Sequence, residues 1–296
     1  MNPVSLVKQH IHLHFIVVLL GFTAILGSLI SLDSIHLVWI RTFLAFIGLW
    51  IYFIIRKTPF KLPAKDQLLL YGIGVIVALH WITFFHAIKI SNVSVTLGVF
   101  ASTTLFTSFL EPLLQKRRIF WLEVLIGLVI IGGIYLIFQY EFEYYLGILF
   151  SLLSAFINAL FIVLNRNISN KYYPTVISFY EMIGGFVAIS LFFLFSGQMD
   201  AHLLNVSSSD LIYLLILGFV CTSYAFSALV EIMKYLSAYT VVLAVNMEPV
   251  YGIILAFFIF GESEKMSGGF YIGALIIILS VVIYPFLRKK VFKKAI

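Results

Sequence analysis

The fold is decided by the stretch Tyr239-Thr-Val-Val-Leu-Ala-Val-Asn-Met-Glu-Pro-Val-Tyr-Gly252, which lies inside an apolar run, residues 237–260, long enough to cross a bilayer. Near the middle of this run, Glu248 is followed at once by Pro249. A charged side chain at the centre of a membrane helix costs about 2.5–3.5 kcal/mol on insertion scales, and proline removes a backbone donor. Both are tolerated where a helix faces protein or water instead of lipid. We therefore expect this helix to line a central polar site. The alternative is a kinked packing helix whose glutamate is buried and protonated.

The composition is that of a membrane protein. Of the 296 residues, 62% are hydrophobic and 11% are charged, against about 25% charged residues in soluble domains. The net charge of +6 does not indicate nucleic-acid binding, because the basic residues cluster beside apolar runs, where they set membrane orientation. A single cysteine, Cys221, allows no intrachain disulfide. No cofactor and no metal site are expected.

Ten apolar runs are long enough to span a bilayer, which predicts an all-α polytopic membrane protein. The predicted spans, first to tenth, are residues 11–31, 35–55, 67–88, 91–114, 119–138, 145–168, 174–196, 211–232, 237–260 and 268–287. We expect the first run to remain as a helix, because no small-residue cleavage site follows it.

The distribution of charge predicts the orientation. With the N-terminus in the cytoplasm, every one of the 19 lysines and arginines falls on the inner side except Arg41, Lys89 and Lys265. We therefore expect a multi-pass protein of the cell (inner) membrane with both termini cytoplasmic.

An internal repeat relates the two halves. The block that begins at Lys89 resembles the block that begins at Lys234, at an offset of roughly half the chain. Residues 1–140 and 141–296 then hold five spans each, and because five is odd the second half is inverted. Inverted five-helix repeats are typical of transporters with a site near the bilayer midplane.

Polar residues inside the spans are the candidate site. We expect Glu111, Glu123 and Glu231, near span ends, to reach the headgroups. The expected substrate-binding residues are Glu248, Asn246, Tyr251, His80, Trp81, Thr83, Asn158, Asn165, Thr104 and Tyr224. Glu248, Glu181 and Arg41 are the candidates for proton coupling or gating.

Each of these residues also has a purely structural interpretation. His80 could be a neutral ring bonded to a neighbouring hydroxyl, and hydroxyls such as Thr104 could bond back to their own helix. Arg41 could extend its head group outward or bind an anionic group. The fifth and tenth spans are rich in glycine, including Gly133 and Gly273, which suits close helix packing, and both are expected at the back of the bundle.

The chain resembles the EamA-type members of the drug/metabolite transporter superfamily over nearly all of its length. The residues that carry the resemblance are Asn246-Met-Glu-Pro-Val-Tyr-Gly252, Phe260-Gly-Glu262 and Tyr271-Ile-Gly-Ala274. The first half departs from the pattern, with Thr103 where the repeat predicts a proline and Lys116 where it predicts a glutamate. The resemblance implies export of small metabolites by alternating access, driven by an ion gradient or by exchange.

The leading functional hypothesis is secondary active transport of small metabolites, such as amino acids or related compounds. The expected partners are a small-molecule substrate, the lipid bilayer, a proton or counter-substrate and, as one option, a second copy of the chain. An intramembrane enzyme is the competing class, but no His-Glu-x-x-His or Gly-x-Ser-x-Gly motif occurs. A structural or receptor protein is the third class. Transport of a labelled amino-acid panel separates these hypotheses.

Overall fold

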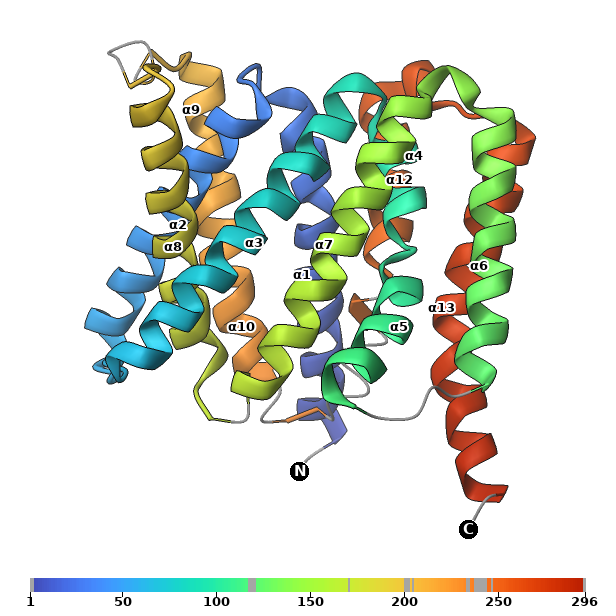
Figure 1. Ribbon diagram of the computed structural model, residues 1–296, viewed down its shortest axis with the longest axis horizontal. Coiled ribbons are helices and arrows are strands. Elements are labelled where there is room, and N and C mark those ends of the chain that lie inside the picture. The colour runs from blue at the N-terminus through green and yellow to red at the C-terminus, as the bar shows by residue number, and fades with distance from the viewer. Residues whose placement is uncertain are drawn as a thin grey trace.

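Helices cross the molecule from one end to the other and back in the computed structural model (Figure 1), which describes residues 3–116, 121–169, 171–199, 203, 205–232, 235–236, 244–245 and 247–294. The first half contains α1 (Pro3–Leu29), α2 (Ser34–Arg56), α3 (Ala64–Ile90), α4 (Val93–Phe100), α5 (Thr103–Gln115) and α6 (Trp121–Tyr140). The second half contains the short η1 (Phe142–Tyr144), α7 (Tyr145–Ser169), α8 (Pro174–Phe195), α9 (Ser208–Leu215), the π-helix η3 (Ile216–Tyr224), α10 (Ala225–Ile232), α12 (Glu248–Phe260), η4 (Gly261–Glu264) and α13 (Gly268–Lys294).

The predicted spans agree closely with these helices. Eight helical stretches of the described chain are long and apolar enough to cross a membrane, from Val7–Leu29 to Ser208–Leu229, and Gly268–Tyr284 is a shorter apolar stretch. The predicted ninth span, 237–260, lies partly outside the described residues, and its described part is mainly α12. The fold is therefore the expected all-α polytopic bundle.

The two five-helix repeats are inverted. In Figure 1, α1 runs upward from the N-terminus and its counterpart α7 runs downward, and both termini lie at the lower end of the bundle. Packing follows the same relation: α3 packs on α7 and α8, α2 packs on α8 and η3, and α1 packs on α12 and α10. We call the end that holds the termini the terminal end and the other the distal end.

Helix starts at the distal end are capped by side chains that the sequence places just before them. Asp33 accepts from the backbone N–H groups of Ile35 and His36 at the start of α2, and Asn92 accepts from Val95 at the start of α4. The first backbone N–H groups of a helix have no partner within it, so each cap satisfies donors that are otherwise unpaired.

The fourth span breaks without a proline. The chain has Thr103 where a proline would match Pro249, which argues against similar kinks in the two halves, yet α4 ends at Phe100 and α5 starts at Thr103. Here the backbone tightens, since the N–H of Ser102 donates to the carbonyl of Val99, three residues back. The break therefore arises from a tight turn and not from a missing donor.

The fifth and tenth spans pack against each other, and their glycines allow a close approach. A Cβ atom on Gly273 would lie 2.7 Å from the carbonyl oxygen of Gly133, and one on Gly133 would lie 2.9 Å from that of Gly273. The backbones of α6 and α13 are thus in direct contact at the edge of the bundle (Figure 1), away from the other helices that surround the site.

The α3–α8 crossing is equally close and positions an ionisable residue. A Cβ atom on Gly74 would lie 2.1 Å from the backbone carbonyl oxygen of Glu181, and one on Gly184 would lie 2.3 Å from that of Tyr71. Only glycine allows this approach, so the place of Glu181 in the bundle depends on a hydrogen atom at position 74.

We predict that Gly74→Ala destabilises the protein by about 1–3 kcal/mol, because the added methyl group overpacks the α3–α8 crossing. Gly72→Ala is the matched control: it lies two residues away on the same helix, and a Cβ there meets nothing within 4 Å. The Gly72→Ala variant should be as stable as the wild type or slightly more stable. Thermal unfolding in detergent measures both, and equal melting temperatures for the two variants would contradict the close crossing.

Candidate functional site

A cavity of about 240 Å³ lies within the bundle, between both halves of the chain. Its volume is close to the lower end of the range of about 300–1,000 Å³ for small-molecule pockets. The lining residues are Leu20, Thr23, Arg41, Val77, His80, Trp81, Phe84, Phe100, Asn158, Phe161, Glu181, Met182, Phe226, Leu229, Val245 and Glu248. The structure thus brings six of the residues singled out from the sequence to one cavity.

Arg41 is the buried cation of the cavity. The residue is 4% exposed, and its guanidinium carbon lies 3.7 Å from the centroid of the Trp81 ring. Its Nε donates to Thr222 Oγ1 at 3.2 Å. Among the described residues, Nη1 has no hydrogen-bond partner. A buried charged donor without an acceptor is costly, so this atom is suited to an acceptor that arrives with a ligand.

Thr222 is held in place by the π-helix η3. Its hydroxyl donates to the carbonyl of Leu217, five residues back, at 2.8 Å and at the same time accepts from Arg41. The next residue, Ser223, likewise contacts the carbonyl five residues back, that of Gly218, at 3.1 Å. The wider turn of a π-helix therefore aims Thr222 at the guanidinium. Helical spacing in the sequence did not predict this contact.

Two carboxyl groups share the cavity with Arg41. Glu181 is 2% exposed and hydrogen-bonded to the side chain of Asn165, and its Oε1 has no partner within the described part of the chain. Glu248 begins α12, is half-buried and interacts electrostatically with Arg41. A cation and two carboxyl groups thus share one cavity, where the low dielectric strengthens the attraction whenever a carboxyl is ionised.

His80 combines its structural role with a place in the cavity lining. Its Nδ1 lies 2.8 Å from Ser154 Oγ and 3.2 Å from the Ser154 backbone oxygen, and its ring stacks on Phe100 with centroids 5.4 Å apart. A carbonyl oxygen only accepts, and Ser154 Oγ itself donates to the His80 carbonyl. Nδ1 therefore carries a hydrogen and donates it, and in the neutral form of the ring Nε2 is the acceptor.

The remaining wall is mainly apolar, with aromatic and aliphatic side chains in similar numbers. Phe84, Phe100, Phe161 and Phe226 line it together with Trp81, and Asn158 adds one amide. A cavity with clustered charges and an aromatic surface suits a small amphiphilic solute. The polar face of α7 turns inward: Ser151 and Ser154 are fully buried, and Asn158, expected at the site, reaches the cavity.

Several residues proposed from the sequence do not line this cavity. Thr83 bonds back to the carbonyls of Leu79 and His80, and Thr104 lines a separate space of about 10 Å³ between α5, α6 and α13. Tyr224 and Tyr251 are paired instead with histidines of α1, His12 at 2.9 Å and His14 at 2.8 Å respectively. Asn165 contacts Glu181 behind the cavity wall, and Asn246 lies outside the described residues.

Two acids near span ends, for which contact with the headgroups was expected, are buried between helices and have protein partners. Glu111 is 9% exposed and ion-paired with Arg166. Glu123 is 3% exposed and accepts from the hydroxyl of Tyr284 at 2.7 Å. Partners from distant helices compensate for their burial, and such partners are invisible in the spacing along one helix.

Inverted helical repeats around an internal cavity are an architecture found in membrane transporters. The comparisons with known proteins identify the family. Residues 11–139 and 145–284 match the EamA-like transporter family, so the chain belongs to that family, which is part of the drug/metabolite transporter superfamily.

One curated protein and one solved structure are similar to this chain over most of its length. The chain is 24% identical over 268 residues to an uncharacterized transporter of Archaeoglobus fulgidus, an alignment that covers 90% of this chain and 92% of that protein. A solved structure titled only "Crystal structure of protein" has a TM-score of 0.64 at 16% identity and covers 95% of this chain and 98% of that one. The latter likeness concerns the fold alone.

We predict that Trp81→Leu and Asn158→Leu lower transport roughly tenfold or more, a loss of ~1.4 kcal/mol in apparent affinity or more, because both side chains line the cavity. Tyr224→Phe and Tyr251→Phe are the controls and should keep wild-type transport, since their hydroxyls bond to α1 histidines. Uptake of labelled amino acids into inverted vesicles measures all four. Loss of transport in the tyrosine variants alone would place the site elsewhere.

Proposed function

We propose that this protein is a secondary active transporter that exports small metabolites bearing an anionic group, such as amino acids, by alternating access. The single observation that carries the proposal is the free Nη1 of Arg41, a buried donor in a cavity of about 240 Å³ that has no acceptor among the described residues. Membership of a transporter family supports the reaction type.

The anionic group is inferred from the fixed geometry of Arg41. Trp81 stacks on one face of its guanidinium and Thr222 accepts from Nε, so the plane of the group is held before a ligand arrives. A guanidinium held in this way forms strong, directed hydrogen bonds to carboxylate oxygens. The aromatic wall would take the apolar part of the same solute.

Glu181 and Glu248 are the proposed coupling groups. A carboxyl enclosed in an apolar bundle can bind a proton on one side of the membrane and release it on the other when its surroundings change. A protonated carboxyl would also leave Arg41 free to bind the anionic substrate. In this scheme proton binding to a carboxyl and substrate binding to Arg41 are linked, because an ionised carboxyl would attract the guanidinium that the substrate needs.

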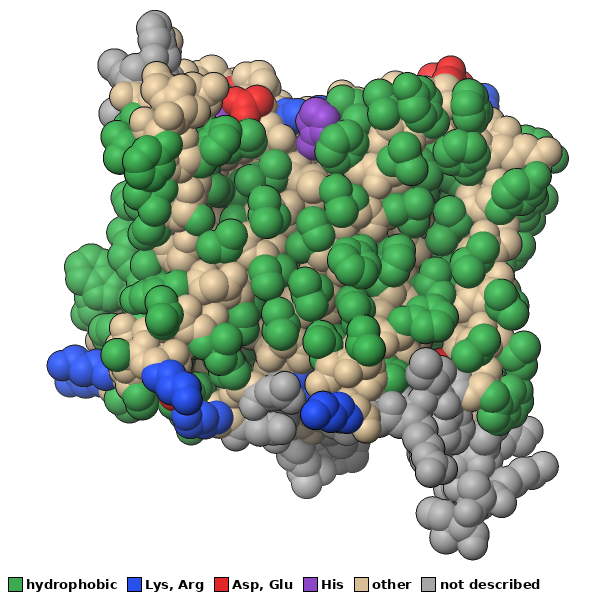
Figure 2. Space-filling view, in the orientation of Figure 1, with side chains coloured by type: hydrophobic (Ala, Val, Ile, Leu, Met, Phe, Trp, Pro, Cys, Tyr) green, Lys and Arg blue, Asp and Glu red, His purple; other side chains and the backbone are tan. Residues whose placement is uncertain are grey.

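The positive charge of the chain supports an inner-membrane location with both termini in the cytoplasm. Most of the lysine and arginine side chains visible in Figure 2 lie along the terminal end, where the termini also lie in Figure 1. Positive residues remain on the cytoplasmic side during insertion. The terminal end is therefore the proposed cytoplasmic end.

Arg41→Gln should abolish recognition of the anionic group. The test compound is the member of an amino-acid panel that most raises the melting temperature of the wild type. At a concentration of roughly 100 times its dissociation constant this compound stabilises the wild type by ~2.7 kcal/mol, and the variant should lose nearly all of that stabilisation. The amide of the same compound should stabilise neither protein. A full stabilisation of Arg41→Gln by the acid would contradict the proposed contact.

The double variant Glu181→Gln/Glu248→Gln should uncouple transport from a proton gradient. Glutamine keeps the size of each side chain but cannot exchange a proton, so uptake driven by a pH gradient in proteoliposomes should fall about tenfold or more, ~1.4 kcal/mol. Exchange of labelled for unlabelled substrate should persist. Gradient-driven uptake at the wild-type rate would exclude both carboxyl groups as coupling residues.

A further inference from the structure

Two aspartates occupy equivalent places in the two repeats. Asp66 is the third residue of α3, and Asp210 is the third residue of α9. Each begins the third helix of its own half, and the inversion of the repeats puts them at opposite ends of the bundle (Figure 1). Neither residue belongs to the cavity, so the proposed transport chemistry does not explain their carboxylates.

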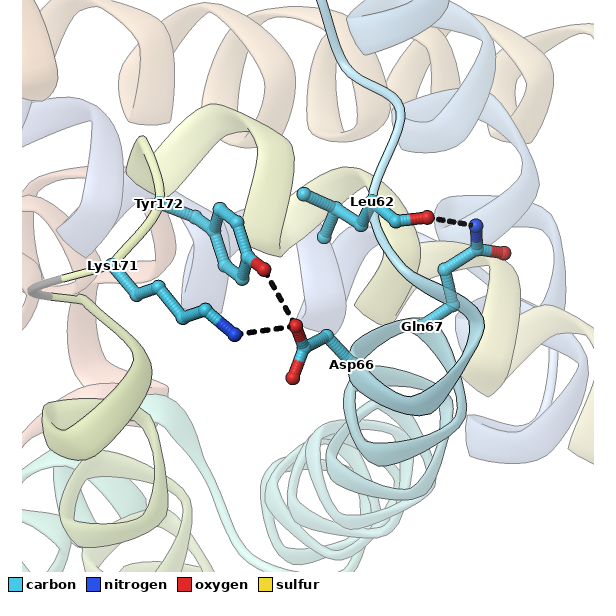
Figure 3. A network of polar contacts seen from close by, with 5 residues as sticks. All are labelled: Leu62, Asp66, Gln67, Lys171 and Tyr172. Carbon is cyan, nitrogen blue, oxygen red and sulfur yellow. Dashed lines mark hydrogen bonds and ion pairs between the residues drawn. The ribbon is translucent and has the colours of Figure 1, made fainter.

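At the terminal end, Asp66 binds the other half of the protein. Its Oδ2 lies 2.6 Å from Lys171 Nζ and accepts from the Tyr172 hydroxyl at 2.5 Å (Figure 3). The hydrogen bond to Asp66 raises the pKa of Lys171 above its usual range. Gln67 donates to the Leu62 carbonyl beside it at 2.7 Å, which fixes the start of α3.

At the distal end, Asp210 makes the equivalent contact. Its two carboxylate oxygens accept from the backbone N–H of Ser31 at 2.8 Å and from the Ser31 hydroxyl at 2.5 Å. Lys89 donates to the neighbouring carbonyl of Ile30 at 2.7 Å. Asp210 is 3% exposed, so this tie is well enclosed.

The partners are equivalent as well. Ser31 lies three residues before the start of α2, and Lys171 lies three residues before the start of α8. Each tie therefore joins the third helix of one half to the loop between the first two helices of the other half. The two contacts have different chemistry, an ion pair with a phenol in one and a backbone amide with a hydroxyl in the other, yet they connect the same places.

We propose that these two ties are matched gates, Asp66 closing the terminal end and Asp210 closing the distal end, and that one must break for the cavity to open at its end. The proposal rests on the alternating access put forward above. Both ties are formed in the present structure. Rocking of one half against the other separates α3 from the α7–α8 loop at the terminal end, or α9 from the α1–α2 loop at the distal end. Because the repeats are inverted, one tie can break while the other stays formed.

Spin-label distances test the gates without a substrate. In the full-length protein carrying Cys221→Ser, which removes the sole native cysteine, one label pair at Lys65→Cys and Tyr173→Cys reports on the terminal end. A second pair at Leu29→Cys and Ser209→Cys reports on the distal end. Double electron–electron resonance in lipid nanodiscs then gives the ratio of wide to narrow distances at each end.

Asp66→Asn should raise that ratio roughly two- to fivefold at the terminal end and leave the distal end unchanged or narrower, as loss of a surface ion pair predicts. Asp210→Asn should do the reverse. Glu262→Gln is the matched control, because Glu262 pairs with Lys265 only three residues away in its own segment, and it should change neither end.

Tyr172→Phe and Ser31→Ala each remove one hydrogen bond of a tie and give the same test if the asparagine variants do not fold. Unchanged distances at both ends, or widening of the same end by both aspartate variants, would overturn the gates. Because no substrate is involved, unchanged distances combined with intact transport would reject the gates and leave the proposed function standing. If the two ends open separately but the protein transports none of the tested compounds, the gates stand and the proposed function is rejected.

Discussion

The burial of a guanidinium inside an apolar helix bundle is the constraint on which the rest of this structure depends. Arg41 is almost fully enclosed, and a charge taken out of water is stable only where other groups compensate for its lost hydration. Here Trp81 supplies a π-face, Thr222 an acceptor and Glu248 a nearby negative charge. These residues come from α3, η3 and α12, so the site exists only when both halves of the chain assemble.

Close helix crossings at glycine residues also fix the positions of the two carboxyl groups. A Cβ at Gly74 would meet the backbone of Glu181, and a Cβ at Gly21 would lie 3.1 Å from the carbonyl oxygen of Glu248. Both glutamates are therefore set by backbone contact, which is stiffer than contact between long side chains. Removal of either glycine should disturb the electrostatics of the cavity even though neither side chain carries a charge.

The sequence alone predicts the spans, the inversion and the polar residues that must avoid lipid. Arg41, His80, Glu181 and Glu248 were found because an ionisable group deep in an apolar run has few other places to go. Tyr224 and Tyr251 were misplaced for a different reason. Helical periodicity shows which residues share a face but not which helix packs against that face. Tyr224 and Tyr251 are hydrogen-bonded to His12 and His14, which lie on α1, more than 200 residues away in the chain. The break before Thr103 escaped prediction because a tight turn needs no proline.

The central claim is that the cavity around Arg41 binds an anionic solute, and an experimental structure with such a solute tests it most directly. The structure should be determined with the protein bound to the amino acid that most raises its melting temperature. The account predicts the carboxylate of the solute within hydrogen-bond distance of Arg41 Nη1, with its apolar part against Trp81 and the aromatic wall. A solute bound outside this cavity, with Nη1 paired only to protein groups, would contradict the account.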